Sequence, residues 1–118
     1  MNENESEYSE AVNVTLLSLV DVHGLPETFA LHQNYPNPFN PSTTIRYDLP
    51  EASSVSLIIY DMMGREVATL MSGQADAGYH FIQWDGTNSI GSSVAAGVYI
   101  YTIQAGKHRD VNKMIYLK

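Results

Sequence analysis

Residues 34–44 read Asn34-Tyr35-Pro36-Asn37-Pro38-Phe39-Asn40-Pro41-Ser42-Thr43-Thr44. Three prolines in six residues exclude a helix, because proline has no backbone N–H to donate and its ring clashes with the preceding turn. They also exclude a central strand, where the ladder needs each N–H. The asparagines between them favour turns. Because Tyr35 and Phe39 are large and apolar, we expect a rigid, extended ribbon pinned to a domain by these two side chains, with the first strand starting at Thr43.

The chain after this ribbon has the pattern of an all-β domain. Apolar and polar residues alternate along residues 43–49 and 54–60, which is the period-2 pattern of half-buried strands. Further strands are expected at residues 65–71, 79–84, 98–105 and 110–118, separated by turns at 61–64, 73–78 and 106–108 and by a longer loop at 85–97. The sequence therefore predicts an immunoglobulin-like antiparallel β-sandwich of about seven strands, occupying residues 28–118.

Residues 1–27 differ from this domain. Val12, Val14 and Leu16 lie in a plausible strand at residues 12–20, which ends at the turn-forming residues 21–26. We interpret residues 1–27 as a linker or as the last strand of an upstream domain, since residues 8–16 resemble the end of a fibronectin-type module. A strand with this apolar content requires a partner, either an edge of the sandwich or a second copy in a homodimer.

Composition limits the classes of partner. The 118 residues carry a net charge of −7, which argues against nucleic acid and anionic membranes as partners. There is no cysteine, so disulfides and thiolate metal sites are excluded. No apolar run approaches the roughly 18 residues of a membrane span, and the acidic N-terminus does not resemble a signal peptide. If the protein is exported, the address lies elsewhere or upstream.

Motifs that carry chemistry are missing from the sequence. The four histidines lack metal-ligand spacing, and no nucleophile elbow occurs. The oxygen-rich loop at residues 85–89 lacks the carboxylate spacing of a calcium loop and is better interpreted as turn-capping side chains. We therefore expect a protein that is not an enzyme and has no cofactor, metal or small-molecule substrate. One binding alternative stays open, because Trp84, Tyr99 and Tyr101 would form a carbohydrate-binding platform if they were exposed in a row, although strand aromatics more often lie in a core.

The residues also carry a family resemblance. Residues 31–47, which contain the ribbon, resemble the opening of the type A C-terminal sorting domain of the type IX secretion system of Bacteroidetes and related phyla. The similarity continues in order through residues 55–67, 78–86, 97–101 and 113–118, and includes the motif residues Trp84, Asp85, Gly86, Gly97 and Tyr99. The stretch from Trp84 to Tyr99 is also similar to the immunoglobulin-like domain of the flagellar hook-capping protein, which lacks the ribbon.

The resemblance implies a non-catalytic secretion signal that directs a cargo protein across the outer membrane. The expected partners are the shuttle and translocon proteins of type IX secretion and a sortase-like cysteine protease that removes the domain. The protein would pass through the periplasm and end at the cell surface or outside the cell. The alternative is a carbohydrate-binding or cell-surface adhesion module of a secreted hydrolase.

Two segments are candidates for recognition by the secretion machinery. One is the ribbon, with Tyr35, Pro36, Asn37, Pro38 and Phe39. The other is the last strand, where Lys113 and Lys118 belong to a basic cluster and both strand faces are apolar. If that strand lies at a sheet edge, a partner could read it by strand addition. Residues 21–28 contain Gly24 and Pro26 and are expected to form an exposed processing site.

Overall fold

The computed structural model describes residues 24–118, so the expected strand at residues 12–20 lies outside the described residues. The described chain is all-β and confirms the immunoglobulin-like sandwich with seven strands. The strands are β1 Ala30–Leu31, β2 Thr43–Leu49, β3 Ser53–Tyr60, β4 Glu66–Ala75, β5 Gly78–Trp84, β6 Gly97–Ala105 and β7 His108–Tyr116.

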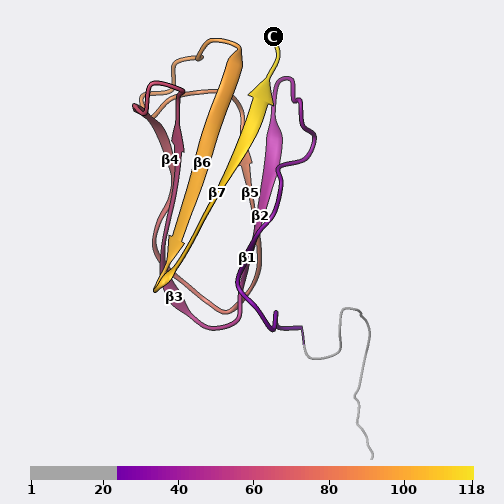
Figure 1. The fold of residues 1–118 in the computed structure, drawn as a ribbon, viewed down its shortest axis with the longest axis vertical. Helices are drawn as coiled ribbons and strands as arrows, with labels where there is room; N and C mark the ends of the chain where they lie inside the picture. The colour runs from indigo at the N-terminus through magenta and orange to yellow at the C-terminus, as the bar shows by residue number, and fades with distance from the viewer. Residues whose placement is uncertain (1–23) are drawn as a thin grey trace, which may run out of the picture.

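Two antiparallel sheets form the sandwich (Figure 1). One has the order β1-β2-β5, and the other has the order β4-β3-β6-β7. Most strand positions agree with the sequence pattern, but the expected turn at residues 73–78 is wrong in its first half. Strand β4 continues to Ala75, which pairs with Ser53, the first residue of β3. The two strands therefore pair along the full length of β3. The polar residues at the end of β4 suit this arrangement because that part of the strand is exposed.

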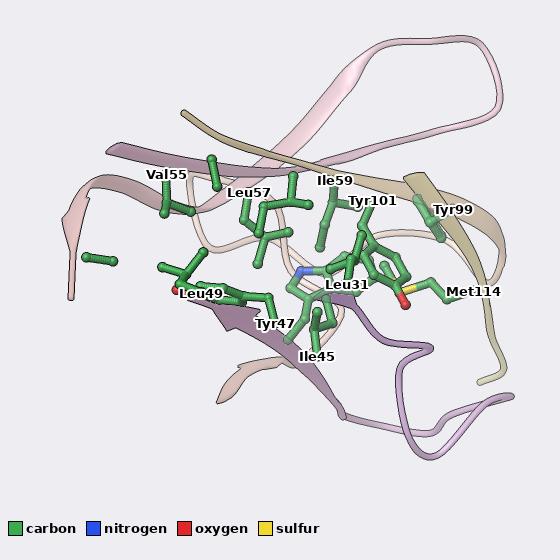
Figure 2. Packing of buried hydrophobic residues seen from close by; sticks show 14 of the residues in the cluster. Leu31, Ile45, Tyr47, Leu49, Val55, Leu57, Ile59, Tyr99, Tyr101 and Met114 are labelled. Carbon is green, nitrogen blue, oxygen red and sulfur yellow. The ribbon is translucent and has the colours of Figure 1, made fainter. Parts of the chain in front are cut away.

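The core lies between the two sheets (Figure 2). The period-2 pattern determines its members: Ile45 and Leu49 of β2 are fully buried opposite Leu57 and Ile59 of β3. Trp84, Tyr99 and Tyr101 belong to the same core, with exposed fractions of 2%, 6% and 0%. The aromatic row is therefore inside the sandwich, and the carbohydrate platform that depended on its exposure is ruled out.

The proline-rich segment is a closed loop, so the expectation of an extended ribbon is wrong. The backbone N–H and C=O of Tyr35 pair with those of Thr44 at 2.9 Å each, and the three X–Pro peptide bonds inside the loop are cis. We call residues 35–44 the proline loop. Phe39 is 1% exposed and confirms the expected anchor, whereas Tyr35 is 81% exposed and does not. The reason is register: Tyr35 is paired with Thr44, which lies on the outward face of β2 between buried Thr43 and Ile45.

Candidate recognition site

The proline loop covers the outer edge of the last strand. Strand β7 ends the four-stranded sheet, and Phe39 forms a parallel bridge with Tyr116 along it. The Phe39 N–H donates to the carbonyl of Ile115 at 3.0 Å, and the Leu117 N–H donates to the carbonyl of Phe39 at 2.9 Å. The loop and the C-terminal strand lie side by side at one end of the molecule (Figure 1).

Side chains extend this contact along the strand. The Ile115 N–H donates to Oδ1 of Asn37 at 2.9 Å, and Nε2 of Gln33 donates to the carbonyl of Lys113 at 2.7 Å. These are groups that an added strand would need. The hypothesis that β7 offers a free edge for strand addition is therefore wrong over residues 113–117, because a partner strand would first have to displace the proline loop.

A buried hydrogen-bond network holds the base of the loop. Asn34 is 2% exposed, and its Nδ2 donates to Oγ1 of Thr43 at 3.0 Å and to the carbonyl of Pro36 at 3.1 Å. Its backbone N–H donates to the Tyr101 hydroxyl at 2.8 Å, and that hydroxyl donates to the carbonyl of His32 at 2.8 Å. Because each of these buried polar groups has a partner, the loop is held in one geometry without a regular strand ladder.

An aromatic cluster fills the space under the loop. The ring of Phe39 stacks on that of Tyr116 with centroids 4.8 Å apart and lies 5.6 Å from the ring of Trp84. Trp84 in turn meets the edge of Tyr99 at 5.4 Å. The polar ends of these rings bond to the loop at residues 85–97: Trp84 Nε1 donates to the carbonyl of Thr87, and the Tyr99 hydroxyl donates to that of Ala95. These contacts explain why large aromatics can be buried here.

The remaining motif residues shape the same end of the sandwich. Gly86 has φ of +77°, and a Cβ atom there would lie 2.7 Å from the ring of Tyr116. Asp85 accepts a hydrogen bond from Oγ1 of Thr87 at 2.6 Å, and Gly97 begins β6. The motif residues therefore position the aromatic cluster, and their role in the structure is in packing.

The structure places the proposed recognition residues at two depths. Tyr35, Pro36 and Pro38 are exposed on the proline loop, and Lys113 and Lys118 are exposed on or just after β7. Phe39 is buried beneath them, and Asn37, although exposed, uses its amide oxygen to bind β7. The loop and the last strand are thus one composite surface, which a linear sequence does not reveal.

A charged cluster on the three-stranded sheet was not expected from the sequence. Asp48 of β2 is 6% exposed and accepts hydrogen bonds from Nε and Nη2 of Arg46 at 2.9 and 3.2 Å, and it lies 2.8 Å from Nε2 of His32. Burial alone would raise the pKa of Asp48, but the hydrogen bonds from Arg46 and His32 outweigh it and lower that pKa. The cluster ties the chain just after β1 to β2. The i, i+2 spacing of Arg46 and Asp48 is visible in the sequence, whereas the approach of His32 is not.

Residues 24–118 contain neither a convergent group of three potential metal ligands nor a helix long and apolar enough to cross a membrane. An open hollow of about 370 Å³ lies beside the charged cluster and is lined by His32, Gln33, Tyr35, Thr44, Arg46 and Phe81.

Comparison with known proteins identifies the sandwich. The model of the FlgD Ig-like domain matches residues 40–109. The chain belongs to this family. The match to the FlgD Ig-like domain begins inside the proline loop and stops within β7, so residues 34–39 and 110–118 lie outside it. The comparison with curated proteins found no match.

Two solved structures share the FlgD Ig-like fold. Dimeric latent PorU from Porphyromonas gingivalis superposes with a TM-score of 0.59 at 23% identity, over 78% of this chain and 10% of that one. PorZ, described as an essential bacterial surface component of the type IX secretion system of the same organism, gives 0.50 at 21% identity, over 76% of this chain and 11% of that one. The chain spans about a tenth of the length of these proteins. At this identity the similarity establishes the fold.

Proposed function

We propose that this FlgD Ig-like domain is a non-catalytic C-terminal secretion signal for type IX secretion. The observation that carries the proposal is that the proline loop is hydrogen-bonded to β7. Residues 34–39 and 110–118 lie outside the family match, yet they are bonded to each other through Phe39, Ile115 and Leu117. Residues 34–39 and 113–118 also belong to the segments that resemble a sorting domain. The occurrence of this fold in PorZ, a type IX component, supports the same conclusion.

The domain would act as a ligand. Residues 24–118 contain a continuous buried core, which is what a domain needs to fold in the same way behind many cargo proteins. A shuttle and translocon would bind it and carry the cargo from the periplasm across the outer membrane. A sortase-like cysteine protease would then cut ahead of β1, leaving the cargo at the cell surface or released. Leu25, Glu27 and Thr28 are exposed there, although Pro26 is buried.

A fusion experiment tests the proposal. The chain is attached to the C-terminus of a periplasmic reporter and expressed in a host that has type IX secretion and in the same host without its translocon. We expect reporter at the surface or in the medium of the first host and periplasmic reporter in the second. Equal periplasmic retention in both hosts would overturn the proposed function.

The carbohydrate-binding alternative loses the observation on which it depended. It required exposed aromatic rings, and Trp84, Tyr99 and Tyr101 are all buried. Their polar atoms are also occupied, as in the hydrogen bond from Trp84 to Thr87.

A further inference from the structure

The four-stranded sheet is apolar on its inner face and, at one end, on its outer face as well. The inward face belongs to the core through Leu57 and Ile59 of β3 and Tyr99 and Tyr101 of β6. Because side chains alternate along a strand, the residues between these point away from the core. They are apolar too: Ile58, Tyr60, Val98 and Ile100 are half-buried, while Ile115 and Leu117 are 37% and 51% exposed. We call these six residues the outer apolar face.

Strand register brings four of the six residues together across neighbouring strands. Tyr60 of β3 is directly opposite Ile100 of β6, and Val98 of β6 is opposite Ile115 of β7. Directly opposed residues in antiparallel strands have side chains on the same face and in contact range. The patch therefore runs across three adjacent strands, whose order is β3-β6-β7.

The patch lies at the same end of the sandwich as the proline loop. Leu117, at its margin, donates its N–H to Phe39, and Ile115 accepts from the Phe39 N–H. On the other side, Tyr60 leads into the β3–β4 hairpin, where Met62 and Met63 are 62% and 80% exposed. Apolar side chains gathered at the surface beside polar residues are typical of a protein interface.

The charges beside the patch indicate what covers it. Lys113 is exposed and lies directly opposite Ile100, and Lys118 follows Leu117. Arg109, farther along β7, is also basic, whereas Glu66 of β4 pairs with Tyr60 on the other side of the patch. A partner with carboxylates beside apolar side chains fits this surface.

We propose that the outer apolar face is the docking surface for the secretion machinery, and that its partner is a protein surface that combines apolar side chains with carboxylates facing Lys113. This inference rests on the proposed function and deepens it. The covered edge of β7 supports it, because recognition through the sheet face leaves the proline loop in place. The loop then serves to fix β7, and with it Ile115 and Leu117, in the sheet.

Two pairs of variants test the proposal in the reporter fusion. Ile100→Thr/Ile115→Thr removes apolar surface from the patch while keeping β-branched side chains that suit strands. Phe81→Thr/Ile90→Thr is the matched control, because these residues are 65% and 85% exposed and lie on β5 and in the loop at residues 85–97. Lys113→Glu reverses the charge in the patch, and Lys107→Glu reverses one in the turn between β6 and β7. Thermal melts of the purified proteins check folding.

We expect export of the Ile100→Thr/Ile115→Thr fusion to fall about tenfold or more, and that of Lys113→Glu to fall several-fold, with Tm within a few degrees of the unchanged chain. Both controls should be exported normally. A photo-crosslinking residue at position 100 should link to a component of the secretion machinery. Normal export of folded patch variants would overturn the docking surface but leave the proposed function standing. A fusion of the unchanged chain that is not exported would overturn both. Sedimentation that shows a dimer lost in Ile100→Thr/Ile115→Thr would assign the face to a second copy instead.

Discussion

The ring of Phe39 stacks on the ring of Tyr116 with centroids 4.8 Å apart and planes only 7° from parallel. The two backbones are also bridged in parallel, so side chain and main chain join the start of the domain to its end. This contact closes the sandwich at the end where the proline loop, the aromatic cluster and the outer apolar face meet. It makes Phe39 the first residue to test.

Phe39→Ala should lower the free energy of unfolding by about 3–5 kcal/mol, because it leaves a cavity between Tyr116 and Trp84. Tyr35→Ala is the matched control in the same loop, and its 81% exposure predicts a change within about 0.5 kcal/mol. Denaturant unfolding measures both. Equal effects of the two substitutions would show that the loop is not anchored through Phe39.

Gly86→Ala should destabilise the domain more than Gly91→Ala. Both glycines have positive φ, at +77° and +88°, so each alanine is strained by roughly 1 kcal/mol. Only at Gly86 would the new Cβ atom meet another side chain, the ring of Tyr116 at 2.7 Å. Thermal melts give the difference, and near-ultraviolet circular dichroism reports on the displaced aromatic cluster. Indistinguishable melts would argue against the contact.

Tyr101→Phe should cost about 1–3 kcal/mol, because it leaves the Asn34 N–H buried without its acceptor. Tyr60→Phe removes a hydroxyl from a half-buried residue on the outward face and should cost far less. Denaturant unfolding of the two variants is compared at one pH. If Tyr60→Phe were the more damaging change, the network at the base of the loop would not be a source of stability.

The Asp48 cluster predicts a specific acid sensitivity. Its folded-state pKa is lowered, so its stabilising contribution is complete above the pKa of an unfolded aspartate, about 3.9, and is lost as the pH falls through the lower folded pKa. The stability difference between the unchanged chain and Asp48→Asn should therefore shrink as the pH falls below about 4. Asp61→Asn is the comparison: the hydrogen bond from the Arg65 N–H, with others from Arg65 and Met63, also lowers the pKa of Asp61. Its side chain is more exposed, 21% against 9% for Asp48, so we expect a change of the same sign and smaller size. A constant difference for Asp48→Asn from pH 6 to pH 2 would contradict the cluster.

The sequence predicts the fold well because apolar and polar residues alternate locally along the strands. The buried set Ile45, Tyr47 and Leu49 follows directly from the period-2 pattern, as does the outward position of Ile58. The conformation of the proline loop is harder to predict from the sequence. Its prolines exclude regular structure, but the pairing of Tyr35 with Thr44, which leaves Tyr35 exposed, is not visible in the sequence pattern.

The candidate site was less predictable for the same reason. The apolar residues on both faces of the last strand are visible in the sequence. The covering of the β7 edge is not, because it depends on hydrogen bonds of the Gln33 and Asn37 amides, and the sequence does not indicate the partners of these amides. Likewise, the outer apolar face requires the register that places Tyr60 opposite Ile100. Contacts between distant strands are set by tertiary packing, which local patterns do not encode.

The central claim is that an Ig-like sandwich becomes a secretion signal when a proline loop is bonded to its last strand, β7. Export of matched fusions tests this claim. A periplasmic reporter carries at its C-terminus either this chain or the Ig-like domain of a flagellar hook-capping protein, which has the sandwich without the loop. Both are expressed in a host with type IX secretion, and the fraction of reporter outside the outer membrane is measured. The account predicts export of the first fusion and periplasmic retention of the second. Export of both, or retention of both, would contradict it.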